Sequence, residues 1–521
     1  MSLNLATVLH DAAVRFPERI SLQSEERAFT FPEMSLWAKK ISSALASIGI
    51  KRGDHVVLMA PNVPEFTAAY FGILNLGAVV VPINTMLVGQ EIAYLLEYSD
   101  ASCFICWAPY ADRCLKAFRT VDDCEHLIFI GPDSEKELDK LRLLNDSLQN
   151  VVFAMEQLIQ PFSGDFDTVQ TGPGDTAVIL YTSGTTGRPK GAELSHFNMY
   201  SNAFYCAYNI MHFTEDDVGI GILPLFHSFG QTVIQNAMMI TGSKIVLVPQ
   251  FEPKKALYQI LQHRITFIAA VPTMFHMMLQ HKKRHNIDTS SLKLAVSGGA
   301  SLSVSLFEEF REAFALDIRE GYGLSETSPI TNFTPIFGLN KAGSIGPAII
   351  GTQVRIMNDA GDFLNPNEIG ELVVRGHNVM KGYYKDPLAT QAAFINDWFR
   401  TGDVAKMDED GYVYIVDRKK DVIIRAGMNI YPREIEELLL HHPSVKEVSV
   451  VGIADATLSE NVIAFVSLVE GSNTTSDELL RYCRDHLAPF KCPKTVHFLE
   501  QLPKGPTGKI QKRDLKELLE I

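Results

Sequence analysis

The first four hundred residues alternate short apolar runs with helical patterns. The runs include "HVVLMA" at 55–60, "AVVVPIN" at 78–84, "TAVILYTSG" at 176–184, "KIVLVPQ" at 244–250 and "LKLAVSGGA" at 292–300. Strands that are apolar on both faces and separated by helices are typical of parallel sheets with helices on both sides. This alternation predicts an α/β fold of αβα-layered sheets. At 521 residues the chain is too long for one hydrophobic core, so we expect at least two domains.

The pattern changes towards the C-terminus. Between residues 343 and 416, "GTQVRIMN", "GELVVRG" and "GYVYIVDR" are strands separated by Gly, Asn and Asp turns, which predicts a small antiparallel β-barrel subdomain. From residue 417 helices and strands alternate again, enough for a separate core. We therefore predict a large N-terminal domain at 1–416 and a small mobile α+β domain at 417–521, joined at a charged hinge.

The charge balance argues against a nucleic-acid partner. The chain has 61 acidic and 47 basic residues, a formal net charge of −14, whereas nucleic-acid binding depends on neutralising phosphates with basic groups. One basic run, "HKKRH" at 281–285, is predicted to be a solvated helix end. The 7 cysteines fit a reduced cytosolic protein, and the single C-x-x-C of Cys103 and Cys106 is predicted to lie on a buried strand rather than to bind metal.

No segment reads as an export signal or a membrane span. The first residues form an amphipathic helix pattern without a basic lead or an apolar core. The most apolar region, residues 66–88, is interrupted by Asn75, Gly77 and Pro82 and is predicted to be buried core. We expect a cytoplasmic protein without a transmembrane segment; the sequence leaves peripheral membrane contact and self-association open.

The stretch "YTSGTTGRPKG" at 181–191 has the composition of a phosphate-binding loop. It follows an apolar strand that ends at Tyr181, and open α/β sheets bind ligands at the carboxyl ends of their strands. Backbone N–H groups, hydroxyls and one lysine can converge on phosphate oxygens there. The residues concerned are Thr182, Ser183, Gly184, Thr185, Thr186, Gly187 and Lys190. The spacing G-x-x-x-x-G-K-[ST] is absent, so the sequence does not predict a loop closed around a permanently held β-phosphate.

This stretch resembles the first core motif of the adenylate-forming superfamily, which includes acyl-CoA synthetases, peptide-synthetase adenylation domains and luciferases. The other motifs follow in the family's order over essentially the whole chain: "PLFHSFG" at 224–230, "SGGA" at 297–300, "GYGLSET" at 321–327, "WFRTGD" at 398–403, "DRKKDVIIRAGMNIYPREIE" at 417–436 and "PKGPTGKI" at 503–510. The resemblance implies an enzyme that joins a carboxylic acid to AMP, releases pyrophosphate and transfers the acyl group to a thiol.

The resemblance also assigns roles to single residues. Tyr322 would stack on adenine, Glu326 would hold Mg²⁺ and Thr327 would contact the α-phosphate. His227 would orient the substrate carboxylate, and Lys509 would neutralise charge on that carboxylate and the α-phosphate. Read without the family, "GYGLSET" is a Gly-punctuated turn, His227 a core histidine and Lys509 a solvated side chain.

Further cofactor-binding candidates follow from the same motifs. Asp403 and Arg418 would hold the ribose, and Thr182 is a second candidate for Mg²⁺. Lys509 lies on the small domain, so that domain would close for adenylation and rotate about Asp417 to admit the thiol, with the loop at Gly427 accommodating pantetheine. The remaining candidates for binding ATP or coenzyme A are Gly298, Gly299, Ala300, Glu320, Gly321, Gly323 and Ile415.

The identity of the acid is less constrained. "VPTMFHMML" at 271–279 resembles the segment that lines the family's acyl pocket, although a helix facing the core would have the same composition. We favour a medium- to long-chain fatty acid, with coenzyme A as acceptor because no carrier domain follows. The alternatives are an aryl-acid CoA ligase, an acyl-AMP ligase that loads a carrier protein, and a non-catalytic binder. The intact Lys190, Glu326, Asp403 and Lys509 argue against the last.

Overall fold

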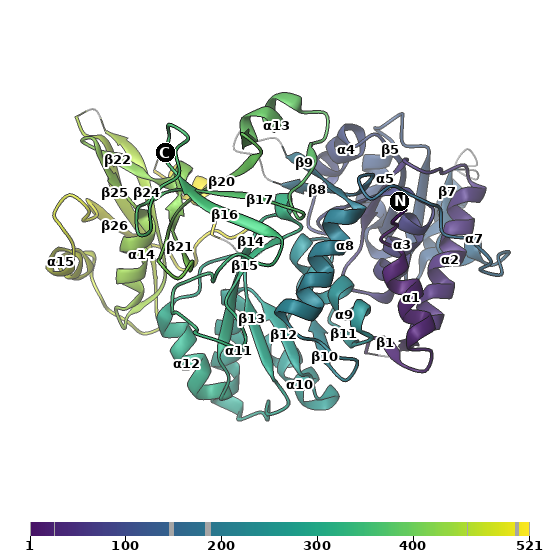
Figure 1. The fold of residues 1–521 in the computed structure, drawn as a ribbon, viewed down its shortest axis with the longest axis horizontal. Helices are drawn as coiled ribbons and strands as arrows, with labels where there is room; N and C mark the ends of the chain where they lie inside the picture. Colours follow the sequence, from purple (N-terminus) through teal and green to yellow (C-terminus); the bar gives the residue numbers. More distant parts are fainter. Residues whose placement is uncertain are drawn as a thin grey trace.

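The computed structural model describes residues 2–25, 27–144, 151–182, 189–455, 457–505 and 510–519. Figure 1 shows a large body that contains the N-terminus and, beside it, a smaller yellow-green domain that follows β21. The predicted fold class is confirmed, since layered α/β sheets form the body and a separate α+β domain follows.

The first sheet of the body has eight strands in the order β15-β14-β13-β12-β10-β11-β1-β2. The two pairs at the edges of the sheet, β14/β15 and β1/β2, are antiparallel, and all the pairs between them are parallel. The strands are β1 (Ile20–Gln23), β2 (Ala28–Thr30), β10 (Val218–Gly221), β11 (Lys244–Leu247), β12 (Phe267–Ala270), β13 (Leu294–Ser297), β14 (Ile318–Gly323) and β15 (Ile330–Phe333).

The second sheet also has eight strands, in the order β18-β9-β8-β4-β3-β5-β6-β7. Only the β8/β9 and β9/β18 pairs are antiparallel. Cys103 and Cys106 are fully buried on β5, so the prediction of a buried strand is confirmed. The strands are β3 (His55–Met59), β4 (Val79–Pro82), β5 (Ala101–Trp107), β6 (His126–Ile130), β7 (Val152–Ala154), β8 (Thr176–Thr182), β9 (Lys190–Ser195) and β18 (Gly382–Tyr383).

One layer of helices lies between the two sheets and shares one hydrophobic core with both. Every residue of α3 is buried, as the apolar composition of 66–88 predicts. This layer contains α1 (Thr7–Arg15), α2 (Phe31–Ser47), α3 (Pro64–Asn75), α7 (Met155–Ile159), α8 (His196–Tyr205), the π-helices η3 (Cys206–Ile210) and η4 (Gly230–Asn236), and α9 (Ala237–Thr241).

Separate helices cover the outer face of each sheet. On the second sheet these are α4 (Gly89–Tyr98), the 3-10 turn η1 (Ala108–Tyr110), α5 (Ala111–Phe118) and α6 (Ser134–Leu144). On the first sheet they are α10 (Pro253–His263), α11 (Pro272–His285) and α12 (Val304–Phe314). The basic run at 281–285 is the last turn of α11, as predicted.

Two smaller sheets complete the chain. The antiparallel subdomain contains β16 (Thr352–Met357), β17 (Gly370–Gly376), α13 (Pro387–Ala393), β19 (Phe394–Ile395), β20 (Trp398–Met407) and β21 (Val413–Arg418). After the turn η6 (Lys419–Asp421), the last domain contains β22 (Ile423–Arg425), β23 (Met428–Ile430), α14 (Pro432–Leu440), β24 (Val445–Asp455), β25 (Ser459–Leu468), α15 (Ser476–His486), β26 (Thr495–Phe498) and α16 (Lys512–Glu517). It has its own core. The domain limits 1–416 and 417–521 stay predictions.

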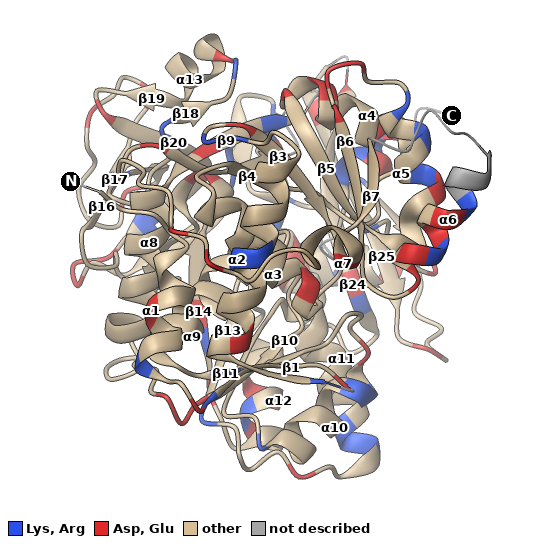
Figure 2. Cartoon of the chain, turned by 90° about the vertical axis from the view of Figure 1, so that its right-hand side faces the viewer, with Lys and Arg blue, Asp and Glu red and all other residues tan. Residues whose placement is uncertain are grey.

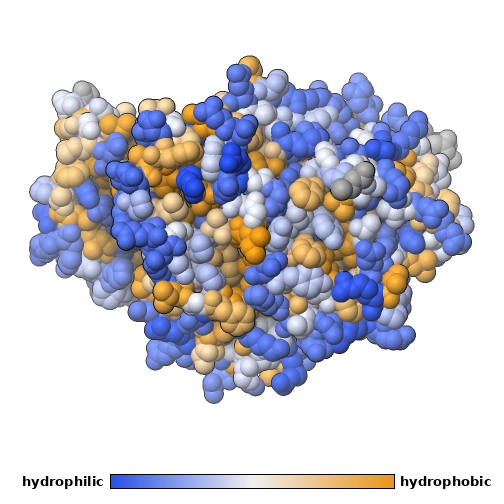
Figure 3. Space-filling model, viewed as in Figure 1, coloured by the Kyte–Doolittle hydropathy of each residue, from blue (hydrophilic) through white to orange (hydrophobic). Residues whose placement is uncertain are grey.

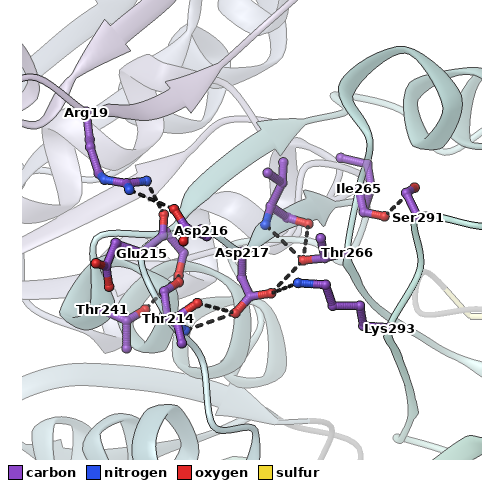
Figure 4. A network of polar contacts seen from close by, with 12 residues as sticks. Arg19, Thr214, Glu215, Asp216, Asp217, Thr241, Ile265, Thr266, Ser291 and Lys293 are labelled. Atoms are coloured by element: carbon purple, nitrogen blue, oxygen red, sulfur yellow. Dashed lines mark hydrogen bonds and ion pairs between the residues drawn. The ribbon is translucent and has the colours of Figure 1, made fainter.

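A polar network links the loops at the amino ends of strands in the first sheet (Figure 4). Asp217, directly before β10, accepts hydrogen bonds from the N–H and the hydroxyl of Thr214 at 2.9 and 3.1 Å. Its other oxygen accepts from the Thr266 hydroxyl at 2.9 Å and lies 3.7 Å from the Lys293 ammonium. Both oxygens of this carboxylate therefore have partners from the loops that precede β10, β12 and β13.

The surface mixes charges and small apolar areas. Figure 2 shows acidic and basic residues dispersed over the outer helices, and Figure 3 shows apolar surface broken into patches by hydrophilic residues. All seven cysteines are buried free thiols. Across the described residues, no helix has the length and apolar character needed to cross a membrane.

Candidate active site

The predicted phosphate loop connects two paired strands of the second sheet. Thr182 is the last residue of β8, Lys190 is the first of β9, and the two residues are register partners. Ser183, Gly184, Thr185, Thr186 and Gly187 lie outside the described residues. The described ends of the loop therefore lie where β8, a parallel neighbour of β4, reaches its carboxyl end.

Glu326 comes from the other sheet and reaches the same place. It lies in the 3-10 turn η5 (Ser325–Thr327) after β14, and only 8% of the residue is exposed. Its Oε1 accepts hydrogen bonds from the Tyr383 hydroxyl at 3.0 Å and from the Thr182 hydroxyl at 3.4 Å. The Lys190 ammonium lies 5.2 Å from the centre of the Tyr383 ring. The structure thus brings Thr182, Lys190 and Glu326 together.

Tyr383 is a contact that the sequence did not indicate. It lies on β18, a two-residue strand that pairs with β9, and it is 57 residues away from Glu326 in sequence. No local pattern in "KGYYKD" marks it, because its significance comes only from the pairing of β18 with a distant strand.

Thr327 uses its hydroxyl within its own turn. The side chain is fully buried, its Oγ1 donates to the Pro329 carbonyl at 2.5 Å, and it accepts from the Leu324 N–H at 3.0 Å. These contacts fix the turn that carries Glu326. The predicted contact between Thr327 and the α-phosphate stays a prediction.

Asp403 and Arg418 face each other across the β20/β21 pair. The Asp403 carboxylate accepts a hydrogen bond of 2.5 Å from the Tyr322 hydroxyl and lies 3.3 Å from Arg418 Nε. Burial and the neighbouring carboxylate raise the pKa of Tyr322 well above its usual value, so the phenol stays a donor. Three predicted nucleotide-binding residues from two sheets are therefore in contact.

The "SGGA" segment continues directly from β13. A Cβ on Gly298 would lie 3.0 Å from the Phe229 ring and 3.3 Å from the Gly321 carbonyl oxygen, so glycine allows three segments to approach closely. Gly299 and Ala300 follow at the carboxyl end of β13. Gly321 and Gly323 lie on the neighbouring β14.

Glu320, also on β14, is a buried carboxyl group beside the small domain. Burial raises its pKa to about 7, although Arg433 and the Leu302 N–H favour the ionised form. Arg433, on α14 of the small domain, donates from its guanidinium to the Ile415 carbonyl at 2.7 Å. Ile415 and Glu320 thus lie where the body meets the small domain.

His227 precedes the π-helix η4. Its Nδ1 accepts from the Phe229 N–H at 3.3 Å, an arrangement that leaves the proton of the neutral ring on Nε2.

The segment predicted to line the acyl pocket lies on α11. There Phe275 and Met278 are fully buried, and the centre of the Phe275 ring lies 5.1 Å from that of the Phe310 ring. Met277 is 47% exposed. Phe275 and Met278 therefore follow the alternative of a core-facing helix, whereas Met277 lies on the exposed side and Met274 is half-buried.

The predicted hinge residue Asp417 connects the two parts of the chain. Its carboxylate accepts from the N–H of Arg433 at the start of α14 at 2.9 Å, and burial raises its pKa. Lys512 forms an ion pair with Glu436 at 2.9 Å.

The predicted pantetheine loop is a hairpin of the small domain. Gly427 lies at the exposed tip of the β22/β23 hairpin with φ +79°. Lys509 lies outside the described residues.

Sequence and structure comparisons agree with this geometry. The family model described as AMP-binding enzyme matches residues 9–384, and that of the AMP-binding enzyme C-terminal domain matches residues 434–509. The chain belongs to the AMP-binding enzyme family. This family membership confirms the resemblance to adenylate-forming enzymes.

Several relatives match over nearly the whole chain. A long-chain-fatty-acid–CoA ligase of Bacillus subtilis (strain 168) is 35% identical, with 98% of this chain and 94% of that protein covered. ATP-bound MatB from Rhodopseudomonas palustris superposes with a TM-score of 0.88 at 29% identity, covering 100% of this chain and 99% of that one. The anthranilate CoA ligase AuaEII in complex with anthranoyl-AMP gives a TM-score of 0.91 at 26% identity, with 99% and 97% covered.

Proposed function

We propose that this protein is an AMP-forming acyl-CoA synthetase that acts on a medium- to long-chain fatty acid. Membership of the AMP-binding enzyme family, together with full-length similarity to fatty-acid–CoA ligases, makes it an acid–thiol ligase. The observation that carries the choice of acid is the full-length similarity to a long-chain-fatty-acid–CoA ligase, 35% identical over 98% of the chain.

The reaction has two steps at one site. A carboxylate oxygen attacks the α-phosphorus of ATP, the bond to pyrophosphate breaks, and an acyl-adenylate forms. The sulfur of coenzyme A then attacks the acyl carbonyl, loses its proton, and displaces AMP to leave a thioester. The first step brings an anion to a polyanion, so it depends on positioning and charge neutralisation.

The nucleotide is held by residues from both large sheets in this proposal. Thr182, Lys190 and the loop between them hold the β- and γ-phosphates until pyrophosphate leaves. Asp403 accepts the ribose hydroxyls with Arg418 beside it. Each carboxylate oxygen has two lone pairs, so the bond from Tyr322 leaves acceptor capacity for the ribose. Tyr322 and the "SGGA" segment enclose adenine.

The residues around Glu326 fit a divalent cation. In the described part of the chain, both hydrogen bonds to this carboxylate come from neutral hydroxyls and end on Oε1, and no basic side chain pairs with it. One or two carboxylates plus phosphate oxygens is the donor set that Mg²⁺ prefers. Mg²⁺ bound there would neutralise the β- and γ-phosphates. No cluster of three Asp, Glu, His or Cys side chains that could hold a metal occurs among the described residues.

The acid and the thiol approach from the remaining sides. His227 orients the substrate carboxylate, and Lys509 on the small domain neutralises charge at the reacting oxygens. The small domain then rotates about Asp417, and the hairpin at Gly427 faces the site and accommodates pantetheine. The exposed position of Gly427 and its left-handed backbone support a loop that is able to meet another surface.

Product analysis with a panel of acids tests the proposal. The protein is incubated with ATP, Mg²⁺, coenzyme A and acids that include straight-chain acids of increasing length, benzoate and cinnamate. We expect AMP, pyrophosphate and an acyl-CoA, with the highest kcat/KM for medium or long chains. ADP as the product would overturn the adenylation mechanism, and discharge only onto a carrier protein would overturn coenzyme A as acceptor.

An aryl acid is the second candidate substrate. The observation that favours it is the TM-score of 0.91 to an anthranilate CoA ligase. The same panel of acids decides between the two, since an aryl-acid ligase would have a higher kcat/KM for benzoate or cinnamate than for a straight-chain acid of any length tested.

We also propose a cytoplasmic location, which the seven unpaired thiols support.

A further inference from the structure

The segment from Met380 to Tyr384 connects the two sheets that build the candidate site. Its strand β18 pairs with β9, with Tyr383 opposite Ala192, and the Tyr384 N–H donates to the Gly191 carbonyl at 2.7 Å. At its other end, the Met380 N–H donates to the backbone carbonyl of Glu326 at 2.8 Å. The segment thus joins the strand that follows the phosphate loop to the turn that carries the acidic side chain.

The Tyr383 side chain lies between the two charged groups of the site. Its hydroxyl donates to Glu326 Oε1 at 3.0 Å, while the Lys190 ammonium lies 5.2 Å from the ring centre. Burial and the Glu326 carboxylate raise the pKa of Tyr383 above its usual range, so its hydroxyl remains a donor. The phenol therefore contacts an anion through its hydroxyl and a cation through its ring face.

The Tyr383 bond is the shorter of the two that orient Glu326. The Thr182 hydroxyl is 3.4 Å from the same oxygen, near the limit for a hydrogen bond, and the Lys190 carbonyl, 3.5 Å away, competes for its single proton. Among the described residues both hydrogen bonds end on Oε1, so Oε2 is left for another partner. The ring also gives Lys190 a favourable position before phosphate is present, since ammonium groups are attracted to the faces of aromatic rings.

We propose that Tyr383 is a positioning residue for the nucleotide site: its hydroxyl fixes the Glu326 carboxylate for a divalent cation, and its ring holds the Lys190 ammonium ready for phosphate. This inference rests on the proposed function, in which Glu326 and Lys190 face Mg²⁺ and ATP. Tyr383 itself touches neither reacting atom, so it acts through its two neighbours.

Three variants separate the hydroxyl, the ring and the local fold. Tyr383→Phe removes only the hydroxyl, and Tyr383→Leu also removes the ring. The control is Tyr384→Phe, which removes an equivalent hydrogen bond, 2.6 Å to Asp100, one residue further along the chain. Thermal unfolding of each variant shows whether the fold is kept.

Metal binding is measured directly, without turnover. Mn²⁺ is titrated into each protein with a non-hydrolysable ATP analogue and followed by electron paramagnetic resonance. We expect Tyr383→Phe to raise the Mn²⁺ dissociation constant about tenfold, the scale of losing a hydrogen bond to a charged group. Tyr384→Phe should leave it unchanged. Tyr383→Leu should also weaken binding of the analogue in EDTA about threefold, because Lys190 must then be ordered on binding.

Each outcome supports or overturns the inference. A wild-type Mn²⁺ dissociation constant for folded Tyr383→Phe overturns it, and so does an equal shift in Tyr384→Phe. If Tyr383→Leu does not fold, Tyr383→Phe decides alone. Failure of the wild-type protein to form any acyl-adenylate overturns the proposed function instead, so the two failures are distinguishable.

Discussion

The two ends of the first sheet hold their carboxylates in different ways. At the amino ends, both oxygens of Asp217 have partners from neighbouring loops, one of them the Lys293 ammonium. Near the carboxyl end of β14, the described contacts of Glu326 are two neutral hydroxyls on one oxygen. A carboxylate whose two oxygens both have local partners stabilises the fold. A carboxylate that is oriented by neutral hydroxyls, with no basic side chain beside it among the described residues, is available to bind a cation.

The largest expected effect is that of Lys509→Ala. Lys509 lies outside the described residues, and we predict that its loss lowers the adenylation rate about 10³-fold, on the scale of removing a preorganised charge from a transition state. Transfer from supplied acyl-AMP to coenzyme A should be largely spared. The two half-reactions are measured separately by ATP–pyrophosphate exchange and thioester formation. Equal losses in both would contradict the alternation of domains.

Glu326→Ala tests the carboxyl-end carboxylate. We predict a drop of about 10²-fold in exchange rate at low Mg²⁺, because the site loses a group that Mg²⁺ prefers. The free energy of unfolding should fall by about 1 kcal/mol at most, because the two partners that Glu326 loses are neutral hydroxyls and no ion pair is broken. Rate is measured over a range of Mg²⁺ concentrations, and an unchanged Mg²⁺ dependence would remove the assigned role.

Asp217→Ala is the reciprocal test at the amino ends. The variant should lose about 1.5 kcal/mol in free energy of unfolding, because the buried Thr266 hydroxyl loses its acceptor and the exposed Thr214 groups exchange theirs for water. The KM for ATP should remain that of the wild type. Urea unfolding followed by tryptophan fluorescence gives the first quantity and steady-state kinetics the second. A raised KM for ATP with an unchanged free energy of unfolding would show that Asp217, and not only Glu326, serves the ligand site.

The smallest effect concerns pH and Glu320. Its pKa is about 7 in the folded chain, above the ordinary glutamate value of about 4.5. Protonation therefore stabilises the fold fully below pH 4.5, and this contribution is lost as pH rises through 7. Between pH 6 and 8 the wild type should lose about 1 kcal/mol more than Glu320→Gln, which cannot ionise. Urea unfolding at both pH values measures this, and parallel losses would contradict the shifted pKa.

The sequence predicted the layered fold because the evidence for it was local. Apolar runs such as residues 55–60 and 78–84 became β3 and β4, and the apolar α3 between them became fully buried. The register between strands that are distant in sequence has no comparable local pattern. The parallel pairing of β1 with β11, which places Leu22 beside Ile245, depends on the whole body having assembled.

The candidate site was predictable to a similar extent. Family motifs identified Thr182, Glu326 and Asp403, and the structure brings each into contact with another predicted residue or strand partner. Tyr383 was missed because its contact depends on long-range strand pairing. On α11, composition alone could not separate a pocket wall from a core face, and packing against Phe310 placed Phe275 in the core.

The burial of all seven thiols makes the protein a convenient subject for spectroscopy. Maleimide dyes react with accessible sulfur, so cysteines introduced at exposed sites such as Arg284 on α11 and Asp477 on α15 would be labelled in preference to the native ones. A donor–acceptor pair at these positions would convert the proposed rotation of the small domain into a change in energy-transfer efficiency, readable on single molecules during turnover.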